Sequence, residues 1–179
     1  MTGKQPDLHG ETVRLRLPEP RDIPAVMAAA NDPETQRWTP MPEFDAERAA
    51  KYVANSGGRW ERGEGTRWVV ADGDDECVGL LDLSFHPGDP GAGEVFFATA
   101  PAARGKGYMT AALRLAAQWA LREHGLARLE WQALVGNTGS RRVAEKAGFQ
   151  YEGLMRQRCL QRGERYDSWV ASMLRDDLG

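Results

Sequence analysis

The strongest constraint on the fold is a glycine-rich run at residues 104–108, which reads Arg-Gly-Lys-Gly-Tyr. An apolar stretch over residues 94–100 precedes this run and is typical of a buried strand. The longest helical pattern of the chain follows it, over residues 107–123, and carries a wide apolar stripe along one side. The sequence therefore predicts a strand that turns through two glycines directly into the beginning of a long helix.

The predicted helix start has the features of an anion site. The first backbone N–H groups of a helix have no partners inside the helix, and the helix dipole makes this end partly positive. Gly105 and Gly107 lack the Cβ atoms that would keep a phosphate away from the backbone, while Arg104 and Lys106 add positive charge. Together these features predict a site for a pyrophosphate group.

Two common nucleotide motifs do not fit this run. A P-loop requires Ser or Thr directly after its lysine, whereas Gly107 follows Lys106. A dinucleotide-binding fingerprint requires a third glycine, and Thr110 stands at that position. A glycine-rich turn that precedes a helix without binding any ligand remains the alternative at this point.

The remaining patterns predict a mixed order of strands and helices. Period-two alternation and short apolar runs predict strands over residues 11–17, 68–70, 78–85, 94–100, 129–135, 149–156 and 165–174. Helical spacing predicts helices over residues 22–31, 45–60, 107–123 and 138–147, with a proline-rich loop over residues 32–44. This order is mixed, and it matches neither a plain doubly wound fold nor a run of hairpins.

The composition excludes several classes of protein. The 179 residues fit one domain over residues 1–179. Lys and Arg total 23 against 26 for Asp and Glu, so the positive excess typical of a nucleic-acid binder is absent. Two cysteines exclude a disulfide scaffold, and no apolar run reaches the ~20 residues of a membrane span. Because the beginning of the chain is also polar, we expect a cytoplasmic protein.

A metal site is not expected. The three histidines show no mutual ligand spacing. The acidic run over residues 72–76 has the residue types of a cation site, but its position between two predicted strands favours a solvated hairpin turn.

Several segments resemble one known family. Residues 104–108 resemble the coenzyme A pyrophosphate loop of the GNAT acetyltransferase superfamily. Residues 137–149, which begin at Asn137 and end in a Gly-Phe pair, resemble a block of the RimJ/RimL-type branch of that superfamily. The closing residues 163–167 and the beginning of the chain also resemble this branch. The resemblance therefore spans nearly the whole chain.

The resemblance implies an α/β (α+β) fold of the GNAT type, with a mixed, mostly antiparallel sheet of six to seven strands and about four flanking helices. Residues 94–100 and 129–135 would be two parallel strands that splay apart where the cofactor enters. The implied protein is an acetyl-CoA-dependent N-acetyltransferase that acts on a primary amine by direct transfer in a ternary complex. Its acceptor would be a protein N-terminal α-amine or a small-molecule amine, and a homodimer is implied by the family.

The alternative is a CoA-binding sensor or structural module without catalysis. This reading stays open because Cys159 stands where some RimL-type relatives have the glutamate proposed as base. Ala144 likewise stands where other GNAT enzymes have a tyrosine acid. Met109 replaces a Gly or Ala of the family pattern, and Phe96-Phe97 replaces its Gly-Tyr pair.

Two residues are candidates for proton transfer. A primary amine with a pKa of ~8–10 is mostly protonated at pH 7 and must lose a proton before it attacks. We expect Glu94 to accept this proton through water, unless it is an ordinary charged residue at a strand end. The resemblance assigns Ser140 to proton or hydrogen-bond donation toward the departing CoA sulfur, with helix capping as the alternative.

The resemblance also assigns binding residues. The expected cofactor-binding residues are Phe97, Ala98, Thr99, Arg104, Gly105, Lys106, Gly107, Tyr108, Met109, Asn137 and Ser140. Backbone groups of residues 97–99 would bond the pantetheine arm like an added strand, and Asn137 would contact its amide. The expected substrate-binding residues are Trp38 and Tyr166.

Overall fold

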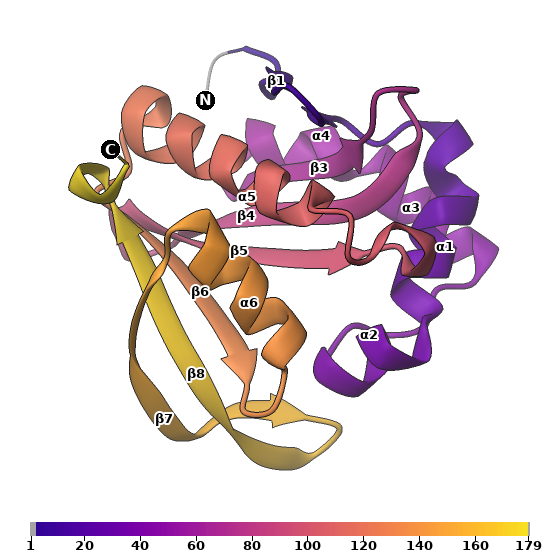
Figure 1. The fold of residues 1–179 in the computed structure, drawn as a ribbon. Helices are drawn as coiled ribbons and strands as arrows, with labels where there is room; N and C mark the ends of the chain where they lie inside the picture. Colours follow the sequence, from indigo (N-terminus) through magenta and orange to yellow (C-terminus); the bar gives the residue numbers. More distant parts are fainter. Residues whose placement is uncertain (1–2, 179) are drawn as a thin grey trace.

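A sheet of eight strands organises the protein, and helices cover both of its faces (Figure 1). The structure is a computed structural model that describes residues 3–178. The strands are β1 (Leu8–His9), β2 (Arg14–Arg16), β3 (Gly65–Ala71), β4 (Cys77–His86), β5 (Asp89–Thr99), β6 (Arg128–Leu134), β7 (Gln150–Gln161) and β8 (Glu164–Leu174). Across the sheet they lie in the order β1-β2-β3-β4-β5-β6-β8-β7.

The described residues form six α-helices. They are α1 (Ile23–Asn31), α2 (Pro33–Trp38), α3 (Ala46–Ala54), α4 (Ser56–Glu61), α5 (Tyr108–Gln118) and α6 (Thr138–Ala147). A π-helical segment, Trp119–His124, extends α5 and ends at Gly125, whose φ is 92°. No helix within residues 3–178 is long and apolar enough to cross a membrane.

Alternation along the central strands divides the core into two parts. Val69 on β3 and Leu80 on β4 pack with α1 and α3. Their neighbours Trp68 and Leu81 pack with Leu113 and other residues of α5 on the opposite face. Because successive side chains of a strand point to opposite faces, adjacent residues reach different helices.

β5 and β6 form a splayed parallel pair near the middle of the sheet. Their register runs only from Ala92, opposite Arg128, to Val95, opposite Trp131. β5 continues to Thr99 and β6 to Leu134 without further pairing between the two strands. The predicted central splay is therefore confirmed, and one edge of β5 after Val95 has backbone groups that β6 does not satisfy.

The predicted class of fold is confirmed, but the predicted numbers of elements were too small. The sheet has eight strands instead of six to seven, and six helices occur instead of about four. The proline-rich loop over residues 32–44 contains α2, because Pro33 begins a helix that Asp32 caps. The helix predicted over residues 45–60 is divided at Asn55 into α3 and α4.

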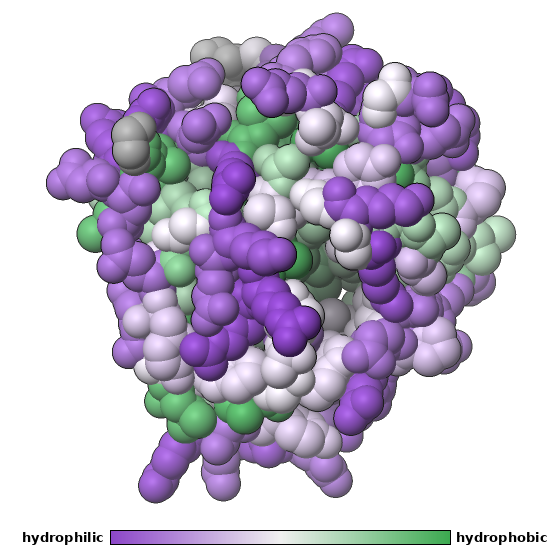
Figure 2. Space-filling model, viewed as in Figure 1, coloured by the Kyte–Doolittle hydropathy of each residue, from purple (hydrophilic) through white to green (hydrophobic). Residues whose placement is uncertain are grey.

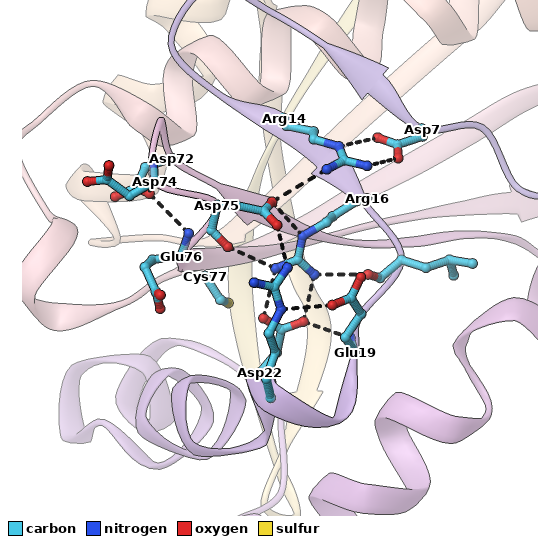
Figure 3. Close-up of polar contacts among 12 residues, drawn as sticks. Asp7, Arg14, Arg16, Glu19, Asp22, Asp72, Asp74, Asp75, Glu76 and Cys77 are labelled. Atoms are coloured by element: carbon cyan, nitrogen blue, oxygen red, sulfur yellow. Dashed lines mark hydrogen bonds and ion pairs between the residues drawn. The ribbon is translucent and has the colours of Figure 1, made fainter.

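An ion-pair network joins the beginning of the chain to the β3–β4 hairpin (Figure 3). Arg16 is only 2% exposed and bonds both carboxylate oxygens of Asp22, at 2.7 and 3.0 Å, and Asp75 at 2.9 Å. Hydrogen bonds from Arg21 and Arg16 lower the pKa of Asp75 to about 2. The acidic run over residues 72–76 is thus a hairpin turn that bonds arginines. Within residues 3–178, no group of His, Cys, Asp and Glu is arranged to hold a metal ion.

Candidate functional site

A cavity of about 960 Å³, called the first cavity below, lies between α2, α5 and α6 at the splayed end of β5. Figure 2 shows this face of the molecule hollowed at the same place. The cavity extends from the free edge of β5 to the N-terminal turn of α5. It therefore joins the two features that the sequence predicts for a cofactor, an anion site and an unpaired strand edge.

The N-terminus of α5 has unsatisfied backbone amides. Gly107 precedes the helix with a φ of 85° and offers no capping side chain, and the first turn contains no acidic residue. Gly105 also has a positive φ, of 77°. A Cβ atom added to either glycine would meet nothing within 4 Å, so the space in front of these amides is open. Consecutive amides in this conformation form a concave nest that suits a phosphate.

Of the two cations predicted to contribute charge at this loop, only one lines the first cavity. Arg104 lines the cavity, but its guanidinium bonds the carboxylate of Asp32 and lies 3.4 Å from the Thr35 hydroxyl. Asp32 in turn caps α2 by accepting the Thr35 amide at 2.9 Å. Lys106 does not belong to the cavity lining. Arg104 therefore ties the glycine-rich loop to α2.

Other cations line the first cavity, and they were not predicted from the sequence. They are Arg114 on α5 and Arg142 and Lys146 on α6. Arg114 also donates a hydrogen bond to the carbonyl oxygen of Lys146. No local motif marks these residues, because their common position depends on how α5 packs beside α6.

The free edge of β5 forms one wall of the cavity through Phe97, Ala98 and Thr99. Met109 also lines it and is buried against β4, where a Cβ on Gly79 would lie only 2.7 Å from the Met109 Cε atom. The methionine that departs from the family pattern is thus accommodated by a glycine on β4.

The beginning of α6 brings Asn137 and Ser140 to the opposite wall. Asn137 is the cap of α6, because its Oδ1 accepts the Ser140 amide at 3.1 Å. The Ser140 Oγ accepts the indole N–H of Trp131 at 3.0 Å. Since Asn137 performs the capping, the Ser140 hydroxyl keeps its own proton for donation toward the cavity.

The two predicted substrate residues lie in different places. Trp38, at the end of α2, lines the first cavity and packs against Gly136 in the β6–α6 turn, where an added Cβ would lie 3.1 Å from the indole ring. Its indole ring therefore forms part of the wall of the first cavity. Tyr166 is on the β7–β8 hairpin, outside this lining, and its hydroxyl donates to Glu164 at 2.7 Å.

Glu94 does not line the first cavity either. It lies on β5 opposite Ser84 of β4 and Glu130 of β6, on the sheet face opposite Val95. Its partial burial raises its pKa above the ordinary value for glutamate. Glu94 and Ser140 are therefore on different sides of the splay.

A family comparison agrees with this geometry. Residues 12–150 match the family model described as acetyltransferase (GNAT) domain. The chain belongs to the GNAT acetyltransferase family. The predicted family is therefore confirmed.

Two curated relatives come from Bacillus subtilis strain 168. The protein named "Probable N-acetyltransferase YjcK" is 42% identical over 73 residues, which are 41% of this GNAT chain and 40% of the relative. The protein named "Uncharacterized N-acetyltransferase YoaA" is 23% identical over 172 residues, which cover 95% of this chain and 97% of the relative.

Solved GNAT structures share the fold. A GNAT-family acetyltransferase from Bacillus anthracis has a TM-score of 0.85, with 22% identity and coverage of 96% of this chain and 99% of the other. The ribosomal-protein α-N-acetyltransferase RimL in complex with coenzyme A has a TM-score of 0.83 and 20% identity, at 96% and 99% coverage. Mycobacterium smegmatis RimJ has a TM-score of 0.83 and 23% identity, at 98% and 89% coverage.

As a member of this family, the protein is an acyltransferase that uses acetyl-CoA as its cosubstrate. The first cavity fits that molecule. Its uncapped helix end suits the diphosphate, and its open strand edge suits an extended amide-containing arm.

Proposed function

We propose that this GNAT enzyme acetylates a primary amine within a ternary complex. A protein N-terminal α-amine is the first candidate acceptor, which the name of RimL supports, and a small-molecule amine is the second. The observation that carries the proposal is the first cavity, because it connects an uncapped helix N-terminus to an unpaired strand edge. Cytoplasmic location and a homodimer stay predictions.

The glycine-rich loop binds the diphosphate in this proposal. The amides of Gly107, Tyr108 and Met109 point out of the first turn of α5 without acceptors inside the helix. Arg114 and Lys146 line the same cavity and add the positive charge that a diphosphate requires.

The edge of β5 binds the pantetheine arm. Residues 97–99 are beyond the last paired residue of β5 toward β6, so their outward backbone groups are available to an extended ligand. Asn137 uses its Oδ1 for capping and keeps its Nδ2 for an amide oxygen of the arm.

Ser140 acts as a proton donor and Glu94 as a proton acceptor, on the two sides of the splay. When bound, acetyl-CoA supplies an activated thioester, and the reaction leaves an acetylated amine and the free thiol of CoA. The Ser140 hydroxyl, oriented by Trp131, donates toward the sulfur side. Glu94 accepts the amine proton through water, and its raised pKa makes it a stronger base than an exposed glutamate.

The proposal is tested by combining calorimetry with thiol release. We expect the protein to bind CoA and to release thiol from acetyl-CoA when N-terminal peptides or small amines are added. Thiol release that no amine in a broad panel stimulates, despite CoA binding, would instead support the non-catalytic module. The position of Glu94 outside the first cavity, with Cys159 in place of a family glutamate, is what favours that second candidate.

Glu94→Gln tests the proton acceptor. Below the pKa of the acceptor amine, most of the amine is charged and a base is needed, so the deficit in kcat/KM should be largest at low pH. At higher pH the amine deprotonates without help, and the variant should approach the parent enzyme. A pH–rate profile with the parent's shape would remove Glu94 from the mechanism.

A further inference from the structure

A second cavity of about 430 Å³ opens on the other face of β5. Phe96 lines it, whereas the next residue, Phe97, lines the first cavity. Since neighbouring residues on a strand point to opposite faces, the two cavities lie on opposite sides of the strand that borders the splay. Phe96 is also the first residue of β5 beyond the last pair with β6, so the second cavity borders the splay.

The inner end of the second cavity has polar side chains, and these already bond one another. Arg67 Nε lies 3.1 Å from Asp82 Oδ2, and each of these side chains is 16% exposed. The Tyr52 hydroxyl donates to Asp82 Oδ1 at 3.2 Å, and the Arg67 guanidinium lies 3.9 Å above the Tyr52 ring. Burial keeps the pKa of Tyr52 well above its usual value, so the phenol remains a donor. Asp82 is thus satisfied and offers no free carboxylate to a cation.

The rim of the cavity carries uncompensated positive charge. Helix α3 contributes Arg48 and Lys51 to the lining. Lys51 pairs with Glu47 at 2.6 Å. The side chain of Arg48 makes no hydrogen bond or ion pair with any residue in 3–178. Of the four charged side chains in the lining, Arg48 alone has no partner in this described part of the chain.

The walls between the rim and the inner end are apolar or aromatic. Met41 and Phe44 come from the segment between α2 and α3, and Phe96 comes from β5. The cavity thus combines an apolar middle with a free guanidinium at its mouth. Guanidinium groups bind carboxylate and phosphate through paired N–H donors.

We propose that the second cavity is the acceptor subsite and that it selects amines with an apolar body and an anionic group, which Arg48 binds. This inference rests on the proposed acetyl transfer and names the class of acceptor. The anion belongs either to a small molecule or to an acidic side chain near a peptide N-terminus, and the two sources share the same chemistry at Arg48.

The test uses three matched amines: para-aminomethylbenzoate, para-aminomethylbenzamide and benzylamine. Their kcat/KM values are measured by thiol release, and their Kd values by NMR titration in the presence of CoA. We expect the benzoate to exceed the neutral benzamide by about fivefold or more, because a charge-assisted pair replaces a neutral contact. The peptide amides Ser-Phe-Asp and Ser-Phe-Asn repeat the comparison and show which source of anion is preferred.

Arg48→Ala should abolish the preference for the anion, so that the values for the benzoate fall to those for the benzamide. Arg62→Ala is the matched control, since it removes an exposed arginine that bonds Glu64 and lines neither cavity. Equal values for benzoate and benzamide, or a preference that survives in Arg48→Ala, overturn the subsite.

The binding and turnover measurements separate the two proposals. Anion-selective binding without acetylation leaves the subsite intact and overturns the proposed acetyl transfer. Acetylation without anion selectivity supports the proposed acetyl transfer and overturns the subsite. Rising salt should also reduce the selectivity of the parent protein, because the Arg48 contact is at the surface.

Discussion

Helices α5 and α6 both begin at the first cavity, but their first turns are satisfied differently. α6 begins at Asn137, whose side chain accepts an amide of the first turn, and Asp32 and Asp45 do the same for α2 and α3. α5 begins at Gly107, which has no side chain to offer. The capped ends contribute stability, whereas the uncapped end of α5 lies at the first cavity and keeps its amides for a ligand.

The largest effect is expected from a charge placed at the uncapped end. Gly107→Asp puts a carboxylate where the diphosphate is expected, and Gly107→Asn puts a neutral group of the same shape there. Both residues tolerate a positive φ better than other side chains. We expect CoA binding by Gly107→Asp to be about 100-fold weaker than by Gly107→Asn, measured by calorimetry. Equal affinities would mean that the diphosphate binds elsewhere.

Substitutions at Asn137 separate the capping role from the binding role. Asn137→Asp keeps the oxygen that caps α6 but loses the Nδ2 donor, so stability should be retained while the KM for acetyl-CoA rises about tenfold. Asn137→Ala should lose both functions. If Asn137→Asp left the KM unchanged, Asn137 would be a cap alone.

A cap far from the first cavity provides the reference for stability. Asp45 accepts the Arg48 amide at 2.7 Å and lines neither cavity. Asp45→Ala should lower the free energy of unfolding by about 1 kcal/mol in urea titrations and leave CoA affinity unchanged. A change in CoA affinity in this variant would show that capping and cofactor binding are coupled at a distance.

The smallest effect is expected at Asp32, which connects a capped end to the uncapped one. Asp32→Asn keeps a good cap for α2 but loses the charge that holds Arg104. Arg104 should then be available to the diphosphate, and CoA should bind about threefold more tightly by calorimetry. Weaker binding would mean that Arg104 acts by fastening α2 in position.

The ion pair of Asp32 and Arg104 makes a contribution to stability that depends on pH. Burial raises the pKa of Asp32, but hydrogen bonds from Arg104 and the Thr35 amide lower it below its ordinary value overall. A lowered folded pKa stabilises the protein above the unfolded value of ~3.9, and this contribution disappears as pH falls through the folded pKa. The stability difference between parent and Asp32→Asn should therefore shrink below about pH 4.

Local patterns were reliable where a single segment sets its own conformation. The helix over residues 138–147 agrees with α6 at both ends, because Asn137 caps it and Gly148 ends it with a φ of 113°. The helix predicted over residues 22–31 ends before Asp32-Pro33, as α1 does, but the loop predicted over residues 32–44 was wrong at its beginning, because the same two residues begin α2. An N-cap followed by proline is also a helix start, and the sequence alone does not say which applies.

The candidate site was predictable only in part, because local motifs supply some of its residues and tertiary packing supplies the others. Gly105, Gly107, Asn137 and Ser140 belong to motifs of adjacent residues, and all four line the first cavity. Glu94 and Tyr166 are in predicted strands, but strand alternation and the bend of the hairpin take them away from that cavity. Arg114 joins it because α5 packs beside α6, a contact that no local pattern describes.

The sequence by itself determined the junction of strand, glycine turn and helix, because positive φ angles and a missing cap depend on adjacent residues. It also determined the family through the order of its motifs. Only the tertiary structure decided which cations surround the first cavity, that Trp38 lies across it, and that Arg48 faces a second cavity. Those positions depend on the packing of helices and strands distant in sequence, and side-chain packing is a property of the whole fold.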